Sequence, residues 1–145
     1  MLIGELSNSG AIPTLELMTR FAGARQRIIA HNIANLPTPD FQPLDVSPTE
    51  FQKALGKAVD ARRQTTGEDG PLPFAGTSQV RVAADGTLML TPGTPSGNIL
   101  FHDRNNRDVE VLMAQEAENV GVFRTSIELL RSRYGIVQAA ISERV

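Results

Sequence analysis

The first long run of hydrophobic and polar positions predicts an amphipathic helix over residues 12–36. Apolar and small side chains recur there every three or four residues, which is the spacing of one helix face. Pro37 and Pro39 follow at once, and the residue before a proline is disfavoured in the α region. The helix is therefore predicted to end near Asn35. Its packing stripe consists of Leu17, Phe21, Ala24 and Ile28.

A second run near the C-terminus follows alternating steps of four and three residues, from Met113 to Ile141, with Glu116 at the one polar position. This spacing predicts a heptad seam on a single helix over residues 108–145, with Asp108 as its N-cap. Such a helix is longer than most in globular proteins and cannot be held by its seam alone. We expect it to pair with the N-terminal helix, with neighbouring copies, or with both. The residues expected to pack are Val120, Phe123, Ile127, Leu130, Tyr134 and Val137.

Small residues recur beside this seam at Ala114, Gly121 and Gly135. One interpretation is a second packing face, where small side chains let another helix approach closely. The other is that they are simply exposed small residues. The pattern leaves both interpretations open.

Residues 37–107 are rich in proline and glycine and predict a loop-rich middle segment with little hydrophobic core. Ser47, Pro48 and Glu50 favour the start of a short helix over residues 48–60. Asp85-Gly86 between β-prone arms predicts a hairpin over residues 79–91. Residues 62–79 and the N-terminal residues 1–11 are expected to be flexible.

The fold class that follows is mainly α. Long N- and C-terminal helices form a coiled-coil-like pair, and the loop-rich middle contributes a short helix and a hairpin.

Composition adds few constraints to this picture. A chain of 145 residues with 41% hydrophobic residues suits one domain. The formal charge of -2 gives no overall electrostatic case for nucleic-acid binding, and Arg62 and Arg63 are expected in a solvated loop. No apolar run is long enough for direct membrane insertion. No Lys or Arg precedes Arg20, so the start lacks the basic region of a cleaved secretory signal.

The sequence offers little catalytic chemistry. Cysteine is absent, which excludes disulfides, thiolate nucleophiles and cysteine-ligated zinc. The two histidines are not in a metal-ligand spacing. Paired carboxylates such as Glu116 and Glu118 are explained by the polar face of a helix. We therefore predict no catalytic, cofactor-binding or metal-binding residues, and no enzymatic activity.

The stretch HNIANLPTPDF, residues 31–41, resembles the signature of the flagellar axial proteins, which comprise rod, hook and hook-associated subunits. That signature is Asn-Ile-Ala-Asn, two residues, then Thr-Pro-Gly-aromatic. The positions that match are Asn32, Ile33, Ala34, Asn35, Thr38, Pro39 and Phe41. Asp40 stands where the family has glycine. Pro39 and Asp40 can occupy the centre of a type I turn, whereas glycine would permit other turns, so the sequence leaves the turn type open.

The C-terminal helix is similar to that of the flagellar basal-body rod family, and closest to its proximal rod proteins. The similarity is carried by Asp108, Met113, Ala117, Glu118, Asn119, Leu130 and Ile141. The resemblance implies a structural subunit of the periplasmic rod, made in the cytoplasm and exported by the flagellar type III apparatus without a cleaved signal. Its implied partners are copies of itself, other rod subunits, and the MS-ring and export-gate components at the rod base. Another short rod subunit and a cytoplasmic helical adaptor of the export system remain alternatives.

Overall fold

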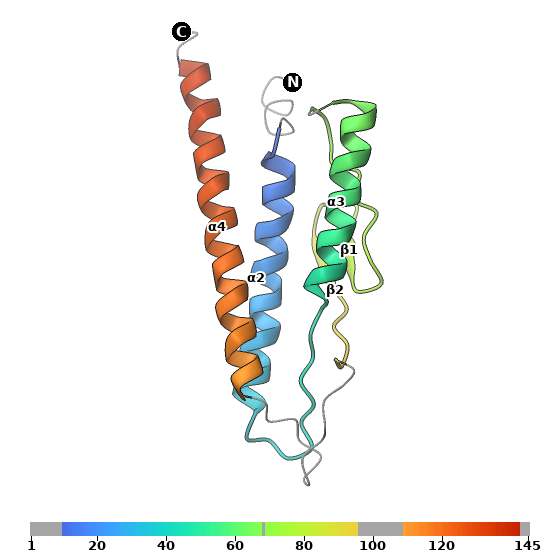
Figure 1. Ribbon diagram of the computed structural model, residues 1–145, viewed down its shortest axis with the longest axis vertical. Helices are drawn as coiled ribbons and strands as arrows, with labels where there is room; N and C mark the ends of the chain where they lie inside the picture. The colour runs from blue at the N-terminus through green and yellow to red at the C-terminus, as the bar shows by residue number, and fades with distance from the viewer. Residues whose placement is uncertain (1–9, 68, 96–108, 143–145) are drawn as a thin grey trace.

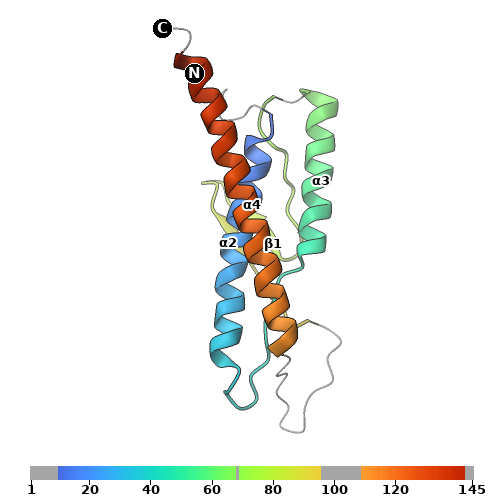
Figure 2. The ribbon, with the colours of Figure 1, turned by 60° about the vertical axis from the view of Figure 1, so that its left-hand side comes forward.

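The computed structural model describes residues 10–67, 69–95 and 109–142, which form a mainly α-helical fold (Figure 1). The long helices are α2, Ile12–Asn35, and α4, Val109–Ser142. They run antiparallel and pack along each other, which confirms the predicted terminal helix pair (Figures 1 and 2). Between them in sequence come helix α3, Pro48–Thr65, and strands β1, Val80–Val82, and β2, Leu88–Leu90. The predicted flexibility of residues 1–9 and the predicted cap at Asp108 lie outside the described residues.

Helix α2 has the bounds that its sequence predicts. A proline occupies its first turn, where the missing N–H has no intrahelical acceptor in any case. At the other end the N–H of Leu36 donates to the carbonyl of Ile33 at 3.3 Å, and the two prolines then prevent another helical turn. The predicted end of α2 near Asn35 is confirmed, because the signal that sets it, the two prolines that follow, is local in the sequence.

Helix α3 begins as predicted but ends later. Ser47 Oγ accepts a hydrogen bond from the N–H of Glu50 at 3.2 Å, which is the expected N-cap. The predicted end at residue 60 is wrong, because the helix continues to Thr65. Beyond residue 60 there is no proline or glycine before Gly67, where φ is +76°.

Arg62 is also not in a solvated loop, since it lies in α3 and its side chain is buried. Its Nη2 donates to the carbonyl of Gly10 at 2.6 Å. This bond joins the last turns of α3 to the chain just before α2.

The predicted hairpin is present as an antiparallel pair in which Val80 lies opposite Leu90 and Val82 opposite Leu88. The Ala83 N–H donates to Thr87 O, and the Gly86 N–H donates to Ala83 O. This is a three-residue loop whose last position needs a positive φ, and Gly86 supplies it at +81°. Asp85 Oδ1 accepts from the Thr87 N–H at 2.9 Å and closes the turn.

The hydrophobic core lies between α2, α3 and the hairpin, not between the two long helices. Helix α2 contributes two buried side chains, and the rings of Phe21 and Phe51 stack with centroids 3.9 Å apart. The expectation that the middle segment adds little core is wrong, because four of the six clustered residues come from it. The buried cluster is Leu17, Phe21, Val46, Phe51, Leu55 and Val80.

Part of the stretch expected to be flexible packs on this core. Leu72 and Phe74 alternate with Pro71 and Pro73 in an extended segment, so both apolar side chains point to the same side. The ring of Phe74 lies 5.8 Å from that of Phe51. The prolines suggested a loop, but they are compatible with an extended chain that makes no ladder hydrogen bonds.

Candidate functional site

The family-like motif forms the junction at which α2 ends and the chain turns back. The side chain of Asn35 donates to the carbonyl of His31 at 2.8 Å, which adds a side-chain hydrogen bond to the last turn of α2. Asn32 is buried and binds the returning chain at two points: its Nδ2 donates to Leu44 O at 2.6 Å, and its Oδ1 accepts from the Leu44 N–H at 3.0 Å. The two asparagines therefore have separate tasks. Asn35 bonds back to the preceding turn of α2, and Asn32 fixes the return strand, our name for residues 42–46, which follow the turn.

The other motif residues surround this clamp. Ile33 and Phe41 are half-buried, and the ring of Phe41 meets that of His31 edge-on at 5.8 Å. Ala34, Thr38 and Pro39 are exposed.

The turn at residues 38–41 is not a type I turn. The Phe41 N–H donates to Thr38 O at 3.3 Å, so Pro39 and Asp40 are its central residues as expected. However, φ of Asp40 is +58°, the one positive value at a non-glycine position in the described part of the chain. Proline followed by a left-handed residue is the pattern of a type II turn, which favours glycine at that position. Asp40 thus adopts a conformation that favours glycine, the residue that the resembled signature has at this position.

This conformation predicts how position 40 responds to substitution. We expect Asp40→Val to lower the free energy of unfolding by about 1–2 kcal/mol, because a β-branched side chain is strained at positive φ. Asp40→Gly should stay within about 1 kcal/mol of the parent, since relief of strain offsets the greater freedom of the unfolded chain. Denaturant unfolding measures both variants, with Gln42→Val at a neighbouring exposed position as the control. Equal stability of the two valine variants would contradict the assignment of the turn.

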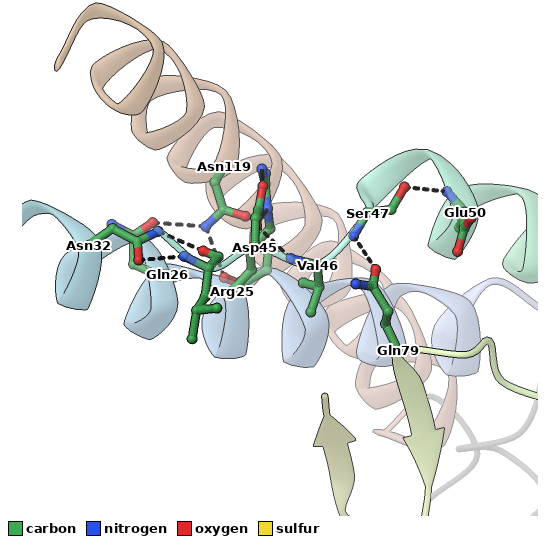
Figure 3. A network of polar contacts seen from close by, with 11 residues as sticks. Arg25, Gln26, Asn32, Asp45, Val46, Ser47, Glu50, Gln79 and Asn119 are labelled. Carbon is green, nitrogen blue, oxygen red and sulfur yellow. Dashed lines mark hydrogen bonds and ion pairs between the residues drawn. The ribbon is translucent and has the colours of Figure 1, made fainter. Parts of the chain in front are cut away.

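A buried ion pair holds the returning chain against α2. Arg25 donates from Nε to Asp45 Oδ1 at 2.9 Å and from Nη2 to Asp45 Oδ2 at 2.7 Å (Figure 3). The arginine side chain is 4% exposed and the aspartate 14%. The backbone of Asp45 pairs with Gly93 through two hydrogen bonds, which ties the segment after β2 to the same point.

The polar network continues from this pair into α3 and the hairpin. The N–H of Ser47 donates to Gln79 Oε1 at 2.9 Å, next to the bond that caps α3 (Figure 3). Sequence reasoning missed Arg25, Asp45 and Gln79. One signal in the sequence could have identified Arg25. It is a charged residue within an apolar stripe, because it lies one turn from Phe21 and from Ile29 on the inner side of α2.

The contact between α2 and α4 is built on polar and small residues. Asn119 is buried, and its Nδ2 donates to Ala22 O at 2.9 Å and to Gln26 Oε1 at 2.8 Å (Figure 3). One heptad later the Thr19 hydroxyl donates to Ser126 Oγ at 3.1 Å. Between these layers Gly23 faces the ring of Phe123, and a Cβ at this position would lie 3.5 Å from the ring, an ordinary van der Waals distance. Polar side chains in such layers fix the register of a helix pair at a cost in stability.

The α4 face that meets α2 is displaced from the predicted seam. Its buried residues are Leu112, Asn119 and Ser126, at intervals of seven. Phe123, Leu130 and Val137 of the predicted set share this side and are half-buried. Val120 and Ile127 are half-buried at its border, whereas Tyr134 is exposed. The predicted seam of α4 was misplaced because the prediction followed the broadest stripe of apolar residues. The contact with α2 instead uses the polar residues Asn119 and Ser126, which hydrogen-bond to Gln26 and Thr19.

The predicted stripe on α2 is divided in the same way. Leu17 and Phe21 are buried in the core against α3. Ala24 and Ile28 are half-buried and line a hollow beside the hairpin. The four residues therefore do not form a single contact with α4.

Helix α4 leaves a large apolar surface uncovered. Seven of its large hydrophobic side chains are between 41% and 58% exposed. A Cβ at Gly121 or Gly135 would meet no atom within 4 Å, so neither glycine serves an intramolecular contact among the described residues. The exposed hydrophobic residues are Val109, Val111, Met113, Leu129, Tyr134, Ile136 and Ile141.

The single tyrosine of the chain reports on the α2–α4 contact. The Tyr134 hydroxyl donates to Glu16 Oε1 at 2.5 Å, and this bond raises the pKa of the tyrosine above 10.0, with a smaller contribution from burial. Because the folded-state pKa is the higher one, the bond stabilises the fold below pH 10.0 and this contribution is lost as pH rises through the raised pKa.

We expect the phenolate absorbance of the native chain to appear at higher pH than in the unfolded chain. Glu16→Gln should move the titration back toward the ordinary value, since the negatively charged acceptor is lost. Spectrophotometric titration measures this directly, because no tryptophan and no second tyrosine contributes. Glu128→Gln on the exposed face of α4 is the matched control and should leave the curve unchanged.

The described residues offer no evident metal or membrane chemistry. No group of three or more His, Asp or Glu side chains among them is placed to hold a metal ion. None of the helices, over the described residues, has the length and apolar character to cross a bilayer. The features that stand out in the site are thus a rigid junction, a polar helix pair and an exposed apolar face.

Comparison with known proteins adds no assignment. No protein-family model matches the chain, and no curated protein shows significant sequence similarity to it.

Proposed function

We propose that the chain is a structural subunit of the bacterial flagellar basal-body rod, of the proximal, FlgB type. Its terminal helices assemble with copies of the chain and with other rod subunits into the periplasmic shaft that carries torque from motor to hook. The proposal assigns it no catalysis and no cofactor. Export through the flagellar type III apparatus, without a cleaved signal, and contact with MS-ring and export-gate components at the rod base belong to the same proposal.

The observation that carries the proposal is the junction. The residues that resemble the family signature act together: Asn35 bonds back to the preceding turn of α2, Asn32 binds the return strand, and Asp40 adopts a positive φ that favours glycine, the signature's residue there. A coincidental match of residue types would not be expected to reproduce these separate structural tasks.

The exposed face of α4 gives a second line of support. Monomeric proteins rarely leave this many large apolar side chains of one helix in contact with water, and clusters of them mark interaction surfaces. A subunit that is buried in an assembly on most sides needs them. The polar α2–α4 layers fit the same function, because they set the register of the pair while leaving the apolar residues outside.

Quantitative mass spectrometry of purified hook-basal bodies from the source cell tests the proposal. We expect a small fixed number of copies in each basal body. Absence from basal bodies, with the chain in the cytoplasm, would overturn it in favour of an adaptor of the export system. Cross-linking to neighbours within the basal body then distinguishes the FlgB type from the other short rod subunit, the FlgC type.

Ile127 provides a test by substitution. It is half-buried at the border of the α2 contact, so a neighbouring subunit would complete its burial. We expect Ile127→Asp to exclude the chain from basal bodies and to abolish motility, because a buried unpaired carboxylate costs several kcal/mol. Thr125→Asp, at an exposed position on the same helix, is the control. Normal motility with Ile127→Asp, at unchanged expression and helix content, would contradict this packing role.

A further inference from the structure

A groove runs along α2 beside the hairpin. One hollow of about 370 Å³ has an apolar floor formed by Ala24, Ile28, Leu44, Leu88, Leu90 and Pro92. A second hollow of about 580 Å³ adjoins it toward the hairpin turn and shares Ala24, Arg27 and Leu88 with it. The residues that line the two hollows come from α2, the return strand and the hairpin region. The groove therefore lies on elements that also form the hydrophobic core.

The apolar hollow has a positive rim. Arg27 borders both hollows, is exposed, and has no hydrogen bond or ion pair within the described residues. Arg20, further along, is held by the Gly86 carbonyl and by Glu16. Asp85 is the acidic residue of the second hollow, and its carboxylate accepts the Thr87 N–H. No acidic side chain lines the apolar hollow, so Arg27 leaves an uncompensated charge there.

The first half of α4 has the opposite character. Val109, Met113, Ala117 and Val120 follow one another at steps of four, four and three residues and form one outward ridge of the helix. The first two are 46% and 45% exposed. Over residues 109–123 the helix carries three glutamates and no lysine or arginine, and Glu110 is exposed beside the ridge.

We propose that the ridge at the start of α4 in one copy of this chain docks into the groove between α2 and the hairpin of a second copy. An apolar ridge with an acidic border fits an apolar floor with an arginine at its rim. Because ridge and groove are different surfaces of the same chain, the contact is head-to-tail and can continue from copy to copy into a helical filament. The inference rests on the proposed function and specifies the surfaces through which copies join.

Engineered cysteines test the contact without ambiguity, because the chain has none of its own. One variant carries His31→Cys at the groove and another, with a larger tag, carries Met113→Cys on the ridge. The two are co-expressed, and disulfide formation is followed in isolated basal bodies and in the concentrated purified mixture. We expect a mixed-size dimer. Lys57→Cys, exposed on α3, replaces the groove cysteine as the control.

A charge exchange gives the second arm. Arg27→Glu in the groove variant should lower the yield of mixed dimer several-fold, and Glu110→Arg in the ridge variant should restore it. Arg63→Glu, at an exposed position of α3, should leave the yield unchanged. Failure of the exchange to restore the dimer would overturn the proposed pairing of the two charges.

The outcomes separate this inference from the proposed function. A mixed dimer no more abundant than with the Lys57 control, in both preparations, overturns the inference even when the chain is abundant in basal bodies. A mixed dimer in the purified protein, with no copies in basal bodies, supports the contact and overturns the rod assignment instead.

Discussion

Replacing Phe51 with alanine is expected to lower the free energy of unfolding by about 3–5 kcal/mol. The side chain is 2% exposed, stacks on Phe21 at an interplanar angle of 4°, and contacts Phe74. Its removal leaves a cavity at the point where α2, α3 and the extended segment meet. Such a loss is a large share of the total stability of a domain, which is of the order of 5–15 kcal/mol.

Denaturant unfolding followed by helix content measures the effect of Phe51→Ala. Phe51→Leu retains more of the volume and should cost less, which keeps the comparison usable if the alanine variant fails to fold. Met89→Ala, at a side chain that is 58% exposed, is the control and should change the stability by less than about 0.5 kcal/mol. A loss below about 1 kcal/mol for Phe51→Ala would place the core elsewhere.

Asp45→Ala is expected to have a comparable effect, of about 3–5 kcal/mol, because it leaves the buried Arg25 charge without its partner. The same substitution removes the acceptor that Asp45 Oδ1 offers to the Val46 N–H at 2.8 Å. Asp45 therefore links three parts of the fold. Its carboxylate joins α2 to the return strand, and its backbone pairs with the segment after β2. Loss of the carboxylate should loosen the whole junction, as well as one ion pair.

A double variant distinguishes the charge from the packing. Arg25→Met combined with Asp45→Ala should recover part of the loss, since no buried charge is then left unpaired. Equilibrium unfolding of the single and double variants gives the coupling energy. Glu16→Ala removes the exposed ion pair with Arg20 at 3.8 Å together with the hydrogen bond from Tyr134, and it should still cost less than Asp45→Ala, because both contacts are exposed. Strict additivity of the Arg25 and Asp45 variants would contradict the role of their contact.

Both predictions concern contacts that the hydrophobic pattern did not reveal. Phe51 was recognisable as an apolar position of a short helix, but its partners Phe21 and Phe74 are distant in sequence. Arg25 and Asp45 are separated by the junction, so only the return of the chain brings them together. The same holds for Arg62, whose acceptor Gly10 precedes α2.

The sequence by itself determined the elements whose signals are local. Prolines after Asn35 end α2, Ser47 caps α3, and Asp85-Gly86 turns the hairpin, because each depends on the conformational limits of a few neighbouring residues. The mainly α fold with a terminal helix pair follows from the same local patterns.

Only the tertiary structure decided which faces meet. Helix α2 turns Leu17 and Phe21 toward α3 and presents Thr19, Gly23 and Gln26 to α4, so the helix pair is polar and the core lies elsewhere. Hydrophobicity records how much surface a side chain must bury, but not against which partner. The contacts among the described residues leave seven large apolar side chains of α4 between 41% and 58% exposed.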